Sequence, residues 1–264
     1  MTTAASPAAL PLAPRPALHR SPRTRRSGLV LAWARHTDEL REAQRLRFDV
    51  FSRELGARLT TPLAGHDIDR FDDYCEHLLV RDAATGEVIG TYRVLTPAQA
   101  RRAGGTYSDQ EFDLAPLGPL RARMVELGRS CVHVRHRHGG VVLALWGELA
   151  DFMERNTLDT MIGCASIPMH HHGPPGAAAV WQQLCLNHLA PMRYQVRPRL
   201  ALPLAHSLLP DGMAVPPLIR AYLRLGARLL GPPAWDPTFN TADLPMMMRM
   251  QDLPPRYLQA TSRG

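Results

Sequence analysis

The chain has no lysine, so arginine supplies all 31 of the basic residues among its 264. This bias reflects the composition of the coding genome as much as selection for a particular chemistry. No apolar run reaches the roughly 18–20 residues that a membrane-spanning helix requires, which argues against an integral membrane protein. Aromatic residues make up only 6% of the chain. Nothing therefore indicates the aromatic and basic platform that binds single-stranded nucleic acid, and no nucleic-acid partner is expected.

Cysteine is also scarce, and its spacing gives no sign of a zinc site. The four cysteines, Cys75, Cys131, Cys164 and Cys185, are far apart and form no CxxC pair. Structural thiols in a reducing compartment are therefore expected, which fits a cytoplasmic protein. The run "MHHHGPPG" (169–176) has three adjacent histidines, but these cannot easily point at one ion and no acid lies beside them. No metal is predicted.

The positive charge is concentrated at the N-terminus. Residues 1–28 contain five arginines and no acid, which leaves 26 basic and 24 acidic residues, a net +2, in residues 29–264. The first 28 residues are rich in Pro, Ala and Arg without amphipathic periodicity, so they are predicted to be a disordered tail. A transit peptide is the alternative. The whole chain is 45% hydrophobic, and residues 29–264 are long enough for one domain with a substantial core.

The centre of the chain alternates strands and helices. Apolar spacing predicts a helix at 38–55, a hairpin at 77–95, a short helix at 97–103 and a strand at 123–135. A strong helix follows at 141–156, and a short buried strand at 160–166. This order is typical of an α/β (α+β) domain in which a glycine-bearing turn joins a strand to a helix.

The last third is proline-rich and less regular. We expect a helix at 176–189, a strand at 192–199, a helix at 216–230 and a methionine-rich strand at 244–250, with a largely helical C-terminal extension from about residue 200 to 264. Arg220, Arg224 and Arg228 recur every four residues and would form one basic stripe on the helix at 216–230. Such a helix suits an anionic membrane surface, or it is a core helix with one solvated edge.

One predicted strand carries unexpected charge. In "VELGRSCVHV" (125–134), Glu126 and Arg129 interrupt an apolar run. Strict alternation places these two side chains on opposite faces of the strand. They can share a site only if the strand is bulged, and Gly128 is where a bulge would fit.

Two further stretches each allow two interpretations. The turn "RHRHGG" (135–140) precedes a helix, so it is either a phosphate-binding turn or an ordinary connection. The acidic stretch "HDIDRFDDYCEH" (66–77) is either a solvated loop or a site for an ammonium group or another cation.

The order of charged residues resembles that of acyl-homoserine-lactone synthases, which belong to the GNAT acyltransferase superfamily. The matching residues are Arg47 and Phe51, Asp69 and Asp72, Arg93, and Glu126 and Arg129. Other stretches, including "IGCASIP", "PPLIRAYLRLGARLLGPPAWDPTFNTADLPMMM" and the late "PRY", are more similar to the haemolysin-like ornithine N-acyltransferases of ornithine-lipid biosynthesis. This second resemblance covers residues 38–257. It implies a GNAT-like mixed sheet whose splayed, bulged central strand is flanked by helices.

The family resemblance implies a reaction and a donor site. A 3-hydroxyacyl chain would pass from acyl carrier protein to the α-amine of L-ornithine, giving lyso-ornithine lipid, with the phosphopantetheine thioester as co-substrate and no other cofactor. The pantetheine arm would lie between the splayed strands 123–135 and 160–166. Its contacts would be Val132, Val134, Arg137, Gly139, Gly140, Cys164, Ala165 and Ser166.

The same resemblance implies roles for the other site residues. Glu126, Arg129, Asp69 and Asp72 would be catalytic, and Arg47, Phe51, Arg93 and Ser130 would bind substrate. Glu126 is the expected base, directly or through a water, because an amine must lose a proton before it attacks a thioester. The alternative is that these acids and arginines form a structural ion-pair network between the first helix, the loop and the sheet.

The arginines of the chain indicate an acidic protein partner. Acyl carrier proteins are acidic, so an arginine-bearing rim would attract them. A cytoplasmic enzyme is expected, with peripheral contact to the inner membrane as an option. Two other functions stay open: an acyl-homoserine-lactone synthase that uses S-adenosylmethionine, and a non-catalytic basic module that binds a membrane.

Overall fold

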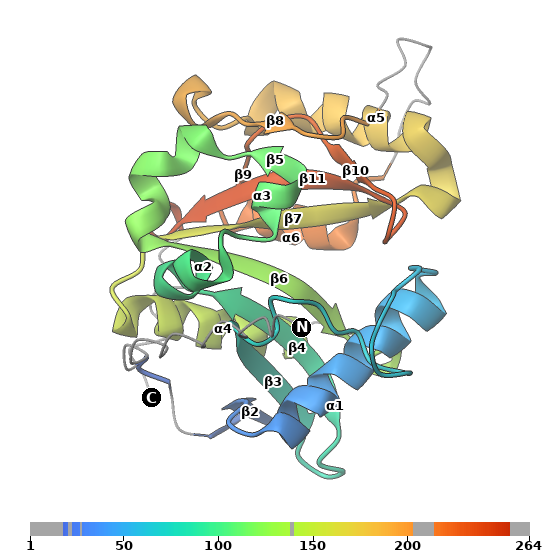
Figure 1. Cartoon of the computed structure of the whole chain (residues 1–264), viewed down its shortest axis with the longest axis vertical. Coiled ribbons are helices and arrows are strands. Elements are labelled where there is room, and N and C mark those ends of the chain that lie inside the picture. Colours follow the sequence, from blue (N-terminus) through green and yellow to red (C-terminus); the bar gives the residue numbers. More distant parts are fainter. Residues whose placement is uncertain (1–17, 21–22, 27, 138–139, 203–213, 254–264) are drawn as a thin grey trace, which may run out of the picture.

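The computed structural model describes residues 18–20, 23–26, 28–137, 140–202 and 214–253. Its centre is a nine-stranded sheet in the order β1-β2-β3-β4-β6-β7-β11-β10, with β9 beside β11 (Figure 1). The strands are β1 (Thr24–Arg26), β2 (Leu29–Trp33), β3 (Glu76–Asp82), β4 (Val88–Leu95), β6 (Met124–Val132), β7 (Thr160–Pro168), β9 (Arg228–Leu229), β10 (Ala234–Asp236) and β11 (Thr241–Arg249). A second, two-stranded sheet pairs β5 (Phe112–Asp113) with β8 (Arg197–Pro198).

Helices cover both faces of the main sheet. They are α1 (Thr37–Phe48), α2 (Pro97–Ala103), α3 (Ser108–Glu111), α4 (Gly140–Arg155), α5 (Met169–His188) and α6 (Pro217–Arg224), and the π-helix η1 (Asp49–Glu54) continues α1. In Figure 1, α1 crosses the front of the sheet over β4, and α4 lies behind it against β2, β3 and β4. No helix among the described residues is both long enough and apolar enough to span a bilayer.

The main core lies between α4 and the sheet. A Cβ at Gly90 of β4 would lie 2.5 Å from Val141 Cγ1 of α4, so the helix can approach the strand this closely because Gly90 has no side chain. The predicted α/β order of residues 38–166 is confirmed, as is the methionine-rich strand, which becomes β11. The C-terminal extension contributes the helix α6 and also three strands of the main sheet.

The central strands separate, as the family resemblance implies. All described pairs in the main sheet are antiparallel except β6 with β7. This parallel pairing covers only Met124–Thr160, Val125–Met161 and Glu126–Ile162, although each strand has nine residues. Beyond Glu126 and Ile162 the two strands diverge and leave a V-shaped gap.

The bulge in β6 lies one residue later than the sequence predicts. Cys131 pairs with Thr91 and Gly128 pairs with Arg93, so Arg129 and Ser130 together oppose Tyr92 alone. The left-handed residue is Arg129, with φ = 51°, and not Gly128. A non-glycine residue in this region costs of order 1 kcal/mol, so its neighbours must hold it there.

Two predictions for the last third are wrong. The expected strand at 192–199 is a 3₁₀ turn, Met192–Tyr194, followed by the two-residue strand β8. The helix expected at 216–230 ends at Arg224, because Gly226 has φ = +90° and closely approaches the Asp252 carbonyl oxygen. Arg228 therefore belongs to β9, and the three arginines do not form one helical stripe.

Part of the predicted disordered tail is ordered. Thr24–Arg26 pairs antiparallel with Leu29–Leu31, and Gly28 adopts the positive φ (+78°) that the tight connection requires. Arg20 forms an ion pair with the buried carboxylate of Glu76. Residues 1–17, where most of the tail prediction falls, lie outside the described residues.

We predict that Gly163→Ala destabilises the fold. A Cβ at Gly163 would overlap the Leu127 carbonyl oxygen just where β6 begins to leave β7. The resulting backbone shift should lower the free energy of unfolding in urea by roughly 1–3 kcal/mol. Gly118→Ala is the control, since a Cβ there meets nothing within 4 Å. Equal stability of the two variants would contradict this account of the strand junction.

Candidate active site

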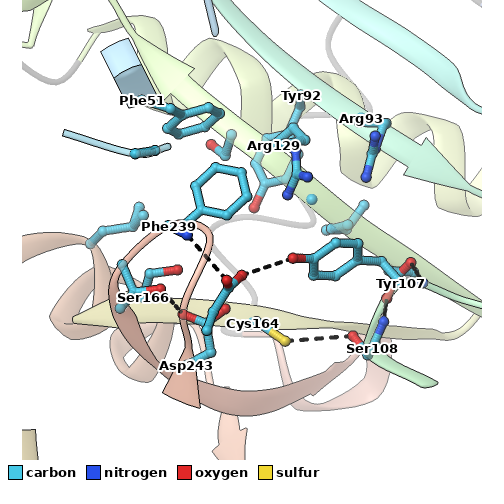
Figure 2. Close-up of a pocket in the computed structure, with 18 of the residues that line it drawn as sticks. Phe51, Tyr92, Arg93, Tyr107, Ser108, Arg129, Cys164, Ser166, Phe239 and Asp243 are labelled. Atoms are coloured by element: carbon cyan, nitrogen blue, oxygen red, sulfur yellow. Dashed lines mark hydrogen bonds between the residues drawn. The ribbon is translucent and has the colours of Figure 1, made fainter. Parts of the chain in front are cut away.

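A cavity of about 210 Å³ lies at the mouth of the V between β6 and β7 (Figure 2). Its polar lining includes Glu126 and Ser130 of β6, Ser166 of β7, Asp243 of β11 and Arg93 of β4. Its aromatic lining comprises Phe51, Tyr92, Tyr107, Tyr222 and Phe239. The structure thus brings together Glu126, Arg129, Arg93, Phe51 and Ser130, as the sequence predicts.

Glu126 is buried at the inner end of this cavity and is only 6% exposed. Its two carboxylate oxygens accept hydrogen bonds from the backbone N–H groups of Tyr107 and Ser108, each at 2.7 Å. Burial raises the pKa of Glu126, although the hydrogen bonds from Ser108 and Tyr107 partly offset this effect. Each oxygen keeps a second lone pair, so the carboxylate can still accept a proton or hold a water.

Arg129 lies between two aromatic rings, at 4.8 Å from the centroid of Tyr107 and 4.4 Å from that of Phe239. Its Nη2 donates to Asp69 Oδ2 at 3.0 Å, and its Nε lies 3.3 Å from Asp67 Oδ2. These cation–π contacts and ion pairs hold the guanidinium at the cavity wall and compensate for the left-handed backbone of Arg129.

Behind this wall, the acidic stretch forms a buried ion-pair network. Arg47 of α1 is fully buried, and its guanidinium contacts Asp67 Oδ2 at 2.9 Å and Asp72 Oδ2 at 2.6 Å. Arg93 Nη1 donates to Asp69 Oδ1 at 2.7 Å and to Asp72 Oδ1 at 2.9 Å.

The carboxylates of this network are ionised and paired with arginines. Burial opposes ionisation of Asp69 and Asp72, but the neighbouring arginines outweigh it and lower the pKa of both carboxyls. Asp69, Asp72 and Arg47 do not line the cavity. Of the two interpretations left open for them, the structure favours the ion-pair network over direct substrate contact, and the acidic stretch is not a solvated loop.

The predicted pantetheine contacts separate into two groups. Cys164 and Ser166 line the cavity, and Ala165 lines the smaller cavity described below. Val132 is buried in the core, whereas Val134 lies after the strand in an exposed 3₁₀ turn.

The glycine-bearing turn is only partly described. Gly140 starts α4, and Gly139 lies outside the described residues. The side chain of Arg137 does not face an open anion site, since its Nη2 contacts Glu54 Oε2 at 2.8 Å and its Nε donates to the Val132 carbonyl at 2.9 Å. Any phosphate contact at this residue is therefore left to its backbone N–H.

A second, smaller cavity opens on the α4 side of the same gap. It is lined by Leu127, Met161, Ala165, Trp146 and three methionines of β11, Met246, Met247 and Met248. It shares Tyr92, Leu127, Cys164 and Tyr222 with the larger cavity. The gap between β6 and β7 thus joins a larger cavity that carries charged and hydroxyl side chains to a smaller, mainly apolar cavity.

Sequence reasoning missed several residues of the site, namely Tyr107, Ser108, Asp236, Phe239 and Asp243. Tyr107 Oη donates to Asp236 Oδ2 at 2.9 Å, which joins the loop before α3 to β10. Asp243 could have been predicted from the sequence, because it is an acid at the start of an apolar strand, the same pattern that indicated Glu126. The others carry no such signal in the sequence.

The comparisons agree with this geometry. Residues 46–147 match a family model described as an acetyltransferase (GNAT) domain. The chain is 37% identical over 249 residues to the L-ornithine N(alpha)-acyltransferase of Rhodobacter capsulatus, covering 87% of this chain and 93% of the relative. A protein of the same name from Brucella abortus is 35% identical over 242 residues, covering 83% of each chain. The chain belongs to the L-ornithine N(alpha)-acyltransferase family. It is an acyltransferase, and the family resemblance in its sequence is confirmed.

Solved structures share the fold of this acyltransferase. A CoA-dependent acyl-homoserine lactone synthase, BjaI, aligns with a TM-score of 0.51 at 16% identity, covering 86% of this chain and 81% of that one. FeeM, an N-acyl amino acid synthase from uncultured soil microbes, aligns with a TM-score of 0.51 at 12% identity, covering 85% and 94%. At these identities the similarity concerns the fold, which is GNAT-like as predicted.

We predict that Arg47→Ala strongly destabilises this acyltransferase. The change leaves the buried carboxylates of Asp67 and Asp72 without one of their cations, at a cost of roughly 3–5 kcal/mol in urea unfolding. Arg53→Ala is the matched control, because Arg53 pairs with Asp49 at the surface and such pairs contribute below about 1 kcal/mol. Similar losses in the two variants would show that the network does not stabilise the fold.

Proposed function

We propose that this acyltransferase transfers a 3-hydroxyacyl group from the thioester of acyl carrier protein to the α-amine of L-ornithine, giving lyso-ornithine lipid. The names of the relatives support the acceptor and the bond that is formed. The observation that carries the proposal is the V between β6 and β7, with the buried carboxylate of Glu126 at the point where pairing ends. The thioester is the co-substrate, and no other cofactor is proposed.

The chemistry fits this arrangement. The α-amine attacks the thioester carbonyl, the C–N bond forms, and the C–S bond breaks to release the pantetheine sulfur. Glu126 takes the proton from the attacking amine and passes it to the leaving thiolate, a role that its raised pKa favours. Because β6 and β7 stop pairing at Glu126, the main chain beyond it can hydrogen-bond the pantetheine amides and the developing oxyanion.

The smaller cavity suits the acyl chain. Its methionine side chains are flexible and apolar, so they can adapt to a hydrocarbon tail. A thioester held in the gap would then direct its acyl chain toward α4 and leave the polar cavity for the amino acid.

Charge at the mouth of the polar cavity suits an acidic carrier protein. Leu55 and Ala57 line that cavity, and the neighbouring Arg53 and Arg58 are exposed. Arg135 is also exposed on the turn before α4. These arginines would attract acyl carrier protein from the cytoplasm, where the enzyme is proposed to act. Peripheral contact with an anionic membrane remains part of the proposal, but no longer rests on a basic stripe at 216–230.

The direct test is an acyl-transfer assay. Purified enzyme, 3-hydroxyacyl carrier protein and L-ornithine should release free thiol and form lyso-ornithine lipid. Thiol release that does not depend on an amine, or that requires S-adenosylmethionine as the acceptor, would overturn the proposed function.

Glu126→Gln should slow this transfer about 100-fold or more, because the base is removed. Part of the rate should return at high pH, where the acceptor amine loses its own proton. The exposed carboxylate variant Glu87→Gln serves as the control and should match the wild type. An unchanged rate in Glu126→Gln, with unchanged melting temperature, would remove Glu126 as the base.

We also predict that Ala165→Leu shortens the acyl chains that are accepted. Ala165 lines the apolar cavity and is buried, so a larger side chain there fills part of the cavity that the acyl chain would enter. The kcat/KM for long-chain donors should fall about 10-fold or more relative to short-chain donors. Met248→Leu nearly preserves volume and should leave the preference unchanged. Equal losses for both chain lengths would place the tail elsewhere.

A further inference from the structure

Two carboxylates and a thiol lie together beside the polar cavity. Asp243 and Cys164 line the side opposite Arg129 (Figure 2), and Glu111 contacts Cys164 from outside the cavity lining. Asp243 of β11 lines the cavity and is 4% exposed. Glu111, the last residue of α3, accepts a hydrogen bond on Oε2 from the Cys164 thiol at 3.1 Å. One oxygen of each carboxylate and the Cys164 sulfur all lie within 4.8 Å of one another.

These carboxylates lack a cationic partner. Among the residues that the structure describes, neither Glu111 nor Asp243 forms an ion pair, whereas each aspartate of the buried network is paired with an arginine. Glu111 Oε1 is buried and accepts no hydrogen bond from the described residues. Asp243 Oδ1 accepts a hydrogen bond from a neutral hydroxyl, that of Thr241, at 2.7 Å. Buried carboxylates are costly without a cation, so a cation bound here would be stabilised.

The electrostatics of the pair agree with this geometry. Burial, together with the nearby charge of Asp243, raises the pKa of Glu111 to about 9. Burial also raises the pKa of Asp243 to about 6, although its hydrogen bond from Thr241 opposes the shift. Near neutral pH the pair therefore keeps a proton, which an entering cation would displace.

We infer that Asp243 and Glu111 bind the side-chain ammonium of the acceptor and so select a diamino acid, an inference that rests on the proposed function. Two oxygens less than 4.8 Å apart can both accept from one nitrogen at about 2.8 Å. An ammonium supplies three donors and no acceptor, which matches two carboxylates. Arg129 on the opposite side suits the carboxylate of the same amino acid, and Glu126 lies in the same cavity to receive the proton of the α-amine.

The same three side chains could also ligate a divalent metal ion. Such a site needs Cys164 as a thiolate. Burial and the nearby charge of Glu111 instead raise the pKa of Cys164 well above its usual value, which keeps the thiol protonated. A protonated thiol donates to Glu111, as observed, and an ammonium needs no deprotonated sulfur. The ammonium is therefore the favoured ligand.

The test compares L-ornithine with L-norvaline, which has the same carbon chain and lacks the side-chain amine. The wild-type enzyme should prefer ornithine by at least about 100-fold in kcat/KM, because norvaline leaves the carboxylates without their cation. Asp243→Asn should reduce this preference about 10-fold or more, chiefly through a higher KM for ornithine. Its rate with norvaline should stay unchanged or rise.

Two further variants separate recognition from folding. Glu111→Gln should reduce the preference in the same direction, whereas the exposed variant Glu87→Gln should keep it. Binding is measured independently of turnover by thermal shift. Ornithine should raise the melting temperature of the wild type more than norvaline does, and the two should be equal in Asp243→Asn.

Each remaining outcome counts against one claim. A wild type that acylates ornithine while Asp243→Asn and Glu111→Gln keep the full preference overturns this inference and leaves the proposed function intact. A wild type that acylates neither amino acid removes the proposed function, and an ornithine-specific thermal shift that Asp243→Asn abolishes would still support the ammonium site. A preference that a chelator removes and a divalent metal restores would assign the carboxylates to a metal and overturn the inference.

Discussion

The active site depends on the point at which β6 stops pairing with β7. The parallel ladder ends at Glu126 and Ile162, and the bulge at Arg129 and Ser130 then turns β6 away from its neighbour. A straight strand would put Glu126 and Arg129 on opposite faces and would close the gap. Divergence instead opens the polar cavity and the smaller apolar cavity, which share four lining residues and are joined through the same gap.

The bulge is held by charge. Arg129 has a positive φ, a backbone conformation that is unfavourable for residues other than glycine. Its side chain is held by two aspartates and two aromatic rings, and these contacts keep the backbone in place. Those aspartates are in turn fixed by Arg47 and Arg93. The aspartates of the acidic stretch are therefore paired with arginines, and these ion pairs support the bulged strand. Among the described residues, Glu111 of α3 and Asp243 of β11 form no ion pair, and the fold brings their carboxylates together beside the cavity.

The order of elements from residue 38 to 166 could be read from the sequence because each has a clear apolar period and nearby turn residues. The two failures in the last third have a local cause. Apolar spacing continues past Gly226, but the positive φ of that glycine ends the helix at Arg224. The stretch near residue 195 has strand-forming side chains, yet its neighbours Leu230 and β5 offer only short segments to pair with.

The sequence by itself determined that the chain is an α/β acyltransferase of this family, and that Glu126 and Arg129 are anomalous in an apolar strand. Only the tertiary structure decided what each charge does. Ion pairing depends on distances between residues far apart in the chain, such as Arg47 to Asp72 and Arg129 to Asp69, and no local pattern encodes them. For the same reason, only the fold could show that Asp243 and Glu111 lie together with no ion-pair partner among the described residues, whereas the acids near residue 70 are paired with arginines.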